Sequence, residues 1–201
     1  MSKRKRVGIL GGTFDPIHIG HLILAENAYN SFELDTVWIM PDNQPPHKNN
    51  VTSSVHRGAM VNLAIQNNPH FEYCGFELER EGPSFTCETL VMFSELHPEN
   101  DYFFIIGADS LFSIEQWKSP EVIFSHATIL AARREDLILA DLEGQINYLK
   151  SKFNAHVFEL EIPNIGISST MIIRKIKASE TIRYYVPMEV ERYIQDNHLY
   201  K

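Results

Sequence analysis

The sequence has little cysteine and no long apolar run. Its two cysteines, Cys74 and Cys87, form neither a metal-ligand spacing nor a disulfide framework, so we expect buried thiols in a reducing compartment. No apolar stretch approaches the roughly 20 residues that a bilayer span needs. The basic residues at positions 3–6 are not followed by the apolar segment of a signal peptide. These absences favour a cytoplasmic protein without a membrane partner.

Excess positive charge is also absent. The 201 residues include 26 acidic and 18 basic side chains, and the net charge of -8 argues against a nucleic-acid partner. A bound nucleotide would therefore need positive groups gathered locally and a divalent cation. The length fits one domain over residues 1–201, with a small helical part from about residue 168, and it leaves a homo-oligomer open.

The two common phosphate-binding fingerprints are missing as well. Gly8, Gly11 and Gly12 do not have the dinucleotide-binding spacing, and no Gly-Lys-Ser/Thr triplet of a P-loop follows them. Generic NAD binding and P-loop hydrolysis therefore lose support.

Short apolar runs alternate with helical patterns along the whole chain. We expect strands over 7–10, 36–40, 71–78, 102–106, 128–132 and 157–162, with helices between and after them. Several strands lack polar alternation, which predicts an α/β fold, a Rossmann-like doubly wound and mostly parallel sheet with helices on both faces. Ligands of such folds bind beyond the carboxyl ends of the strands. The loops expected there are 11–18, 41–48, 107–109, 133–134 and 163–168.

The stretch from Gly11 to His21 joins the first strand to the first helix. His18 and His21 stand three residues apart, so they share one face of the helix start. Free N–H groups and the positive dipole end suit a phosphate there, and Gly20 would let it approach the backbone closely. The alternative is a pair of histidines that only cap the helix.

A second anion site is predicted near the end of the chain. Ser168, Ser169 and Thr170 supply hydroxyls at a helix start, and Arg174 follows one turn later. A plain N-cap with a solvated arginine is the alternative.

The tetrad His18-Ile19-Gly20-His21 resembles the signature of the nucleotidyltransferase superfamily, and the segment 167–174 resembles its second nucleotide motif. Pro45-Pro46-His47-Lys48 and Ile106-Gly107-Ala108-Asp109-Ser110 narrow the resemblance to the bacterial nicotinate-nucleotide adenylyltransferases. It covers nearly the whole chain. It implies transfer of AMP from ATP to nicotinate mononucleotide (NaMN), giving nicotinate adenine dinucleotide and pyrophosphate in NAD biosynthesis.

The resemblance also implies the site residues. His18, His21 and Arg174 would be catalytic, with His21 at the transition state. The ATP site would comprise Gly11, Gly12, Thr13, Phe14, His18, His21, Gly107, Asp109, Ile167, Ser168, Ser169, Thr170 and Arg174. The NaMN site would comprise His47, Lys48, Ser84, Thr86, Asp109, Trp117 and Arg134. No side chain is implied as a metal ligand, because Mg²⁺ would be held by ATP phosphates and water.

The chemistry of NaMN agrees with these assignments. Lys48 would meet the phosphate, and Trp117 would stack on the cationic pyridinium ring. With Ser84 as N-cap of the next helix, the N–H of Thr86 would hold the ring carboxylate, which favours the acid over the amide. The alternatives are a solvated lysine, a half-buried core tryptophan, and an Asp109 that caps its own helix instead of binding ribose.

Several other interpretations stay open at this point. Arg133 and Arg134 would either approach phosphate or lie in a solvated loop, and Arg57 would either serve the site or form a structural ion pair. Rival functions are a sibling transferase that uses phosphopantetheine, or one that uses CTP and a phospho-alcohol. A non-catalytic nucleotide sensor and a metal site at His18 and His21, which lacks a third ligand, are the others.

Overall fold

Six parallel strands form the central sheet of the computed structural model, which describes residues 3–43, 51–80, 82–133 and 139–201. The strand order is β3-β2-β1-β4-β5-β6. Their bounds are Lys5–Gly12 (β1), Thr36–Pro41 (β2), Phe71–Tyr73 (β3), Asn100–Gly107 (β4), Ala127–Ala132 (β5) and Val157–Leu160 (β6). The order reverses between β1 and β4, which is where a doubly wound sheet opens a crevice for its ligand. The predicted α/β fold is confirmed.

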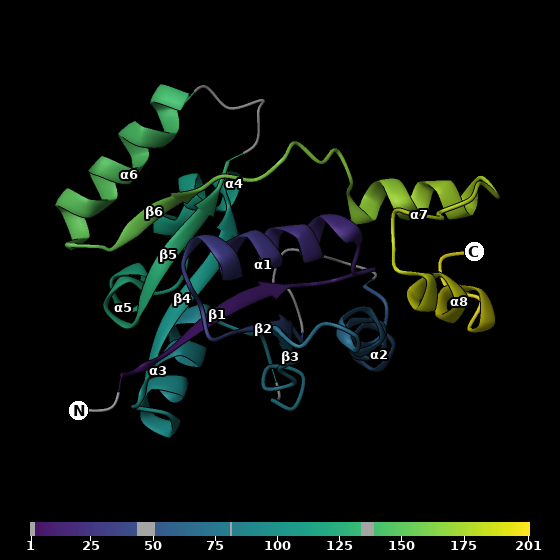
Figure 1. The fold of residues 1–201 in the computed structure, drawn as a ribbon, viewed down its shortest axis with the longest axis horizontal. Coiled ribbons are helices and arrows are strands. Elements are labelled where there is room, and N and C mark those ends of the chain that lie inside the picture. The colour runs from purple at the N-terminus through teal and green to yellow at the C-terminus, as the bar shows by residue number, and fades with distance from the viewer. Residues whose placement is uncertain (1–2, 44–50, 81, 134–138) are drawn as a thin grey trace.

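Two groups of helices cover the two faces of this sheet (Figure 1). One face carries α3 (Thr86–Leu96), α4 (Ala108–Ser113), α5 (Pro120–His126) and α6 (Leu139–Phe153), with the short 3-10 turn η1 (Ile114–Gln116) between α4 and α5. The other is covered by α1 (Ile19–Ser31) and α2 (Ser54–Ile65), and α7 (Ser169–Lys177) and α8 (Met188–Asp196) join the same core cluster beyond the end of the sheet. None of the helices in the described ranges is both long and apolar enough to cross a membrane.

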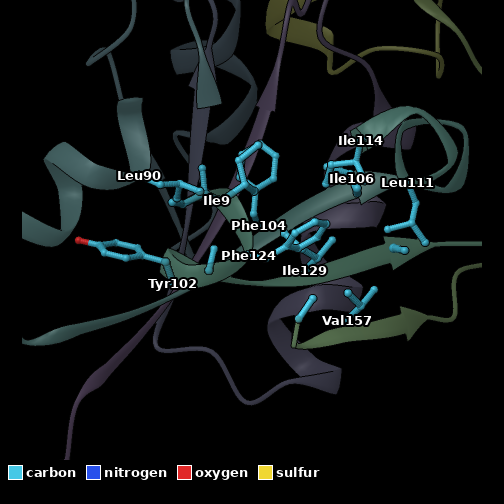
Figure 2. Close-up of a cluster of buried hydrophobic side chains, with 14 of the residues drawn as sticks. Ile9, Leu90, Tyr102, Phe104, Ile106, Leu111, Ile114, Phe124, Ile129 and Val157 are labelled. Atoms are coloured by element: carbon cyan, nitrogen blue, oxygen red, sulfur yellow. The ribbon is translucent and has the colours of Figure 1, made fainter. Parts of the chain in front are cut away.

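Strand β4 shows how the apolar runs produce these two layers. Tyr102, Phe104 and Ile106 belong to the cluster under α3 to α6, whereas Phe103 and Ile105 belong to the cluster under α1, α2, α7 and α8. Successive side chains of a strand point to opposite faces, so a strand buried on both faces is apolar throughout. Figure 2 shows part of the first cluster, with Phe104 among side chains contributed by neighbouring strands and helices.

The predicted strand over residues 71–78 is wrong beyond Tyr73. The chain turns at Gly75, whose carbonyl accepts hydrogen bonds from the N–H groups of Leu78 and Glu79 at 2.9 and 3.2 Å. β3 is an edge strand that pairs only with the middle of β2, so little holds it extended further. The turn takes Glu77 out of the sheet and into a cavity wall.

The C-terminal helices share a core with the sheet. Ile172 of α7 and Val190 and Ile194 of α8 are buried in the same cluster as Leu10 of β1 and Phe14. α7 and α8 lie beyond the carboxyl end of β1 (Figure 1), so they stand next to the loop that leads into the first helix.

Candidate active site

The loop between β1 and α1 packs its motif residues closely. Phe14 is buried and has a left-handed backbone (φ 48°), a conformation that costs a non-glycine residue about 1 kcal/mol or more. Its ring meets the His21 ring edge-on, with 5.0 Å between centroids. Strain of this kind persists only where the surrounding packing fixes the backbone, so the loop is held in one shape.

The two motif histidines lie one above the other at the start of α1. Their rings stack with centroids 3.6 Å apart, and His18 is buried while His21 is half-buried. Nδ1 of His21 accepts a hydrogen bond from the backbone N–H of His18 at 3.2 Å. A neutral imidazole that accepts at Nδ1 carries its proton on Nε2, so the Nε2 atom of His21 is a hydrogen-bond donor. Helix capping and ligand binding are therefore compatible in this residue.

Gly20 leaves space for the side chain of His18. A Cβ at this position would lie 3.1 Å from two atoms of the His18 ring and 3.6 Å from Ile165. The space that a side chain at residue 20 would need is taken by the His18 ring. The absence of a side chain at residue 20 therefore lets His18 fold over the helix start.

The second predicted motif meets this loop directly. The hydroxyl of Ser169 donates to the carbonyl of Pro16 at 3.0 Å. Ser168 is the N-cap of α7, and its hydroxyl accepts from the N–H of Met171 at 3.2 Å. Thr170 and Arg174 are exposed on the same helix. Residues more than 140 positions apart are thus joined, and the starts of α1 and α7 are neighbours.

Two further contacts fasten the C-terminal part to the loop. The backbone N–H of Ile19 donates to the carbonyl of Tyr185 at 2.9 Å. The hydroxyl of Tyr200 donates to Asp15 Oδ1 at 2.5 Å, while Asp15 Oδ2 accepts from the N–H of Thr52 at 3.0 Å. Burial and the Asp15 carboxylate raise the pKa of the Tyr200 phenol, so it stays protonated as a donor.

Arg57 ties together the loops that follow β1 and β2. This side chain is 1% exposed and lies on α2. Its guanidinium donates to the carbonyls of Thr13, Asn43 and Thr52 at 2.8, 2.8 and 2.9 Å, and to Asp42 Oδ1 at 3.2 Å. Asp42 in turn accepts from the Thr13 hydroxyl at 3.0 Å. Of the two roles left open for Arg57, the structure realises the ion pair, and that pair sits under both loops.

A cavity of about 500 Å³ opens beside the same loops. Gly11 and Gly12 line it at the end of β1, and Trp117 and the start of α3 line it from the other face of the sheet. Leu10 pairs with Ile105 in the sheet, so Gly12 stands level with Gly107 at the end of β4. The cavity therefore lies at the point where the strand order reverses.

The N-terminus of α3 forms one wall of this cavity through Ser84, Phe85 and Thr86. Ser84 was expected as the N-cap, and this is wrong, because the N-cap is Phe85. The Ser84 hydroxyl instead accepts from the N–H of Asn43 at 3.3 Å. No side chain in the described part of the chain caps α3 by a hydrogen bond. Its first-turn N–H groups at the cavity are therefore suited to an anion.

Trp117 and Lys118 form the opposite wall. The Trp117 ring meets Phe104 edge-on, with centroids 6.4 Å apart, and is half-buried. Lys118 Nζ lies 2.6 Å from Glu88 Oε1 and 4.3 Å from the centre of the Phe85 ring. The hydrogen bond to Glu88 raises the pKa of Lys118. The cavity thus combines an aromatic wall with a cation at its edge.

These features agree with the protein family that the sequence matches. The model described as cytidylyltransferase-like matches residues 9–175. A probable nicotinate-nucleotide adenylyltransferase of Lachnoclostridium phytofermentans is 38% identical over 94% of this chain and 96% of its own length. One of Symbiobacterium thermophilum is 40% identical over 97% and 95% of the two chains. The chain belongs to the nicotinate-nucleotide adenylyltransferase family.

Solved structures agree with the adenylyltransferase fold. The nicotinic acid mononucleotide adenylyltransferase of Plasmodium falciparum, complexed with NaAD, superposes with a TM-score of 0.80 at 22% identity. The alignment covers 98% of this chain and 97% of that one. These structures confirm the fold, and the curated relatives confirm the resemblance to the family that rests on the sequence motifs.

Other predicted site residues either lie outside the described part of the chain or make other contacts. His47, Lys48 and Arg134 lie outside the described residues. Arg133 pairs with Glu159 at 2.9 Å instead of facing the crevice freely. Asp109 was also weighed as a helix cap, but Gly107 is the N-cap of α4 and Asp109 follows in its first turn.

The site also contains residues that motif reasoning missed. Asp42, Glu77 and Lys118 line the cavity, and Tyr200 reaches the first loop from the C-terminal part. No spacing rule singles them out, since each comes from a different element. Of these four residues, only Asp42 could have been found from the sequence, because it is the polar residue directly after the apolar run of β2. Within the described ranges, no group of three or more His, Cys, Asp or Glu side chains is placed to hold a metal ion.

Proposed function

We propose that this protein transfers the AMP group of ATP to NaMN, forming nicotinate adenine dinucleotide and releasing pyrophosphate. The observation that supports this proposal most directly is the cavity, which is lined by Gly11 and Gly12 and by Trp117 and the start of α3. One end of it is lined by Gly11 and Gly12, which lead into the loop that carries the two histidines, and the other offers an aromatic wall and helix N–H groups. Family membership supports the same reaction, since the matched relatives are named nicotinate-nucleotide adenylyltransferases.

No side chain needs to act as a nucleophile in this reaction. The phosphate of NaMN is ionised at neutral pH, and one of its oxygens attacks the α-phosphorus of ATP. The bond from that phosphorus to the bridging oxygen breaks, and pyrophosphate leaves with the electron pair. Catalysis then consists of alignment of the two phosphates and stabilisation of the charge that spreads over the α-phosphate oxygens.

We assign the ATP half of the site to the β1 loop and the start of α7. The Nε2 proton of His21 would donate to the α-phosphate, where charge increases in the transition state. His18, Thr170 and Arg174 would contact the remaining phosphates. Two neighbouring helix starts add N–H groups and positive dipole ends, which compensate locally for the net charge of -8.

We assign the NaMN half to the far side of the cavity. Trp117 would stack on the pyridinium ring, and the N–H of Thr86 would hold the ring carboxylate at the uncapped start of α3. An amide carries no net charge and gains less from a helix N-terminus, so the acid should be the preferred substrate. Gly107 and Asp109, at the end of β4, are assigned to ribose.

ATP is proposed to enter with Mg²⁺. The donor set fits a metal held by phosphate oxygens and water, because the described residues supply no carboxylate cluster of their own. When bound, such an ion neutralises charge on the phosphates of ATP.

Pyrophosphate release tests the proposal. ATP with NaMN should give pyrophosphate and the dinucleotide in equal amounts, whereas nicotinamide mononucleotide and pantetheine phosphate should react more slowly by at least about tenfold, the effect of about 1.4 kcal/mol. CTP in place of ATP tests the nucleotide. No product with ATP and NaMN, or equal rates with pantetheine phosphate, would refute the proposed function.

A further inference from the structure

Glu77 is a buried acid in the cavity wall with no role in the reaction described above. Its side chain is 5% exposed, and it lies on the turn after β3, outside every motif that we identified. Acidic side chains are rarely buried to this extent unless hydrogen bonds or ion pairs compensate them. Its position beside a site for anionic substrates therefore requires an explanation.

The carboxylate of Glu77 joins two parts of the chain at the start of α3. Thr89, in the second turn of the helix, donates its hydroxyl to Glu77 Oε1 at 2.8 Å. The hydroxyl of Ser84, just before the helix, also lies near the carboxylate and opposes the rise in its pKa. Residues 84 and 89 bracket the uncapped first turn, which includes Thr86. Glu77 therefore holds this turn through Thr89, beside Ser84.

The same connection continues to the other half of the site. Ser84 accepts from the N–H of Asn43, and the carbonyl of Asn43 accepts from Arg57. Arg57 also holds the carbonyl of Thr13 in the β1 loop. Buried hydrogen bonds thus lead from the ATP side, through the loop after β2, to the start of α3. Glu77 lies at the α3 end of this series of hydrogen bonds.

Keeping a carboxylate here carries a cost in stability. Burial raises the pKa of Glu77, the hydroxyls of Thr89 and Ser84 oppose the rise, Asp42 adds to it and Arg80 counters it. Among the described residues, Lys118 and Glu88, which form an ion pair, also lie near this wall. An acid whose pKa is raised on folding stabilises the protein below its unfolded pKa and loses that contribution as pH rises. Glutamine avoids this loss, but one of the two acceptor oxygens is replaced by an NH2 group, which cannot accept a hydrogen bond from a hydroxyl.

We propose that Glu77 is a positioning residue for the mononucleotide: by accepting from Thr89 beside Ser84 in the cavity wall, it holds the first turn of α3 so that its N–H groups face the ring carboxylate. This inference rests on the proposed function. It goes further by making acid-over-amide selectivity depend on a residue that does not touch the substrate.

The test compares Glu77→Gln with the wild type. The KM for NaMN should rise about three- to tenfold, corresponding to about one buried hydrogen bond, with the KM for ATP unchanged within about twofold. The KM for nicotinamide mononucleotide should rise less, so the selectivity for the acid narrows. At neutral pH the variant should melt no lower than the wild type, since a buried charge is removed.

Tyr102→Phe is the matched control. Tyr102 is equally buried and donates to the carbonyl of Phe93 at 2.9 Å, near the other end of α3. This variant loses a hydrogen bond to the same helix and should melt at a lower temperature, yet both KM values should stay at those of the wild type.

Thr89→Val completes a double-mutant cycle with Glu77→Ala. Both changes break the same link, so the double variant should raise the KM for NaMN no more than Glu77→Ala alone does. A normal KM for NaMN in Glu77→Gln and Glu77→Ala would overturn the inference, as would equal increases for acid and amide. An inactive wild type would instead contradict the proposed function itself.

Discussion

The two halves of the crevice are built differently. The half that we propose for ATP gathers residues from two motifs, 11–21 and 167–174, which are compact in the sequence and joined by the hydrogen bond between Ser169 and Pro16. The half that we propose for NaMN draws its walls from the ends of β1 and β2, the turn after β3, the start of α3 and the segment around Trp117. The first is a binding loop at two helix starts, and the second is a shaped cavity.

We infer from this difference that one half serves the chemical step and the other serves recognition of the mononucleotide. Stacked histidines and helix starts can stabilise charge on phosphate, which suits the chemical step. An aromatic wall and an uncapped helix suit recognition of a ring that carries a cation and a carboxylate. Changes on the first side should therefore affect kcat, and changes on the second should affect the KM for NaMN.

The largest effect should follow from His21→Ala. Removing the Nε2 donor should lower kcat by roughly 100-fold, the usual cost of losing a donor to a developing oxyanion. His70→Ala is the matched control, because His70 is also a ring-stacked histidine, 3.9 Å from the Tyr29 ring centre, but lies away from the crevice. Steady-state rates with NaMN and ATP measure both. A kcat within about threefold of the wild type in His21→Ala would exclude this role.

Arg57→Lys should disturb both halves at once. A lysine keeps the charge but cannot reproduce the forked contacts to Thr13, Asn43 and Asp42, and disrupting a buried pair costs about 3–5 kcal/mol. We expect a lower midpoint in urea unfolding and higher KM values for both substrates. Arg4→Lys, at the exposed pair with Asp101, should change stability by less than about 1 kcal/mol. Loss of only one substrate's affinity in Arg57→Lys would contradict the link between the halves.

Trp117→Ala should act on the NaMN half alone. Loss of the stacking wall should raise the KM for NaMN about tenfold, from an interaction of about 1–2 kcal/mol, and leave the KM for ATP unchanged. Trp38→Ala removes the other tryptophan, which packs against the same core cluster but away from the cavity, and should reduce stability only. If Trp117→Ala and Trp38→Ala had the same KM for NaMN, Trp117 would be a core residue and not part of the substrate site.

Tyr200→Phe should give the smallest effect and should belong to the ATP half. It removes the donor to Asp15, so kcat should fall a few-fold, as expected for about 1 kcal/mol of lost loop order. Tyr193→Phe is the control, since its hydroxyl contacts His56 Nδ1 at 2.9 Å and not the loop. Equal kcat values in both variants would show that Asp15 is held without Tyr200.

The fold could be predicted because its strands are buried on both faces and read as apolar runs. The exception, residues 71–78, lies at the sheet edge, where a turn at Gly75 competes successfully with further pairing. The two motifs proposed for ATP could also be found from the sequence, since the residues of each are adjacent in the chain, and the structure brings the motifs together. Glu77 and Tyr200 were not, because their partners Thr89 and Asp15 are brought near only by the tertiary fold. Ser84 was misread as a cap because its hydroxyl accepts from the N–H of Asn43 instead.

Calorimetric titration of NaMN into the His21→Ala variant tests the division of labour most directly. If chemistry and recognition are separate, the variant that has lost its turnover should bind NaMN with a Kd within about twofold of the wild type, a difference under about 0.5 kcal/mol. A Kd raised tenfold or more, about 1.4 kcal/mol, would contradict the account, because His21 would then hold the mononucleotide as well.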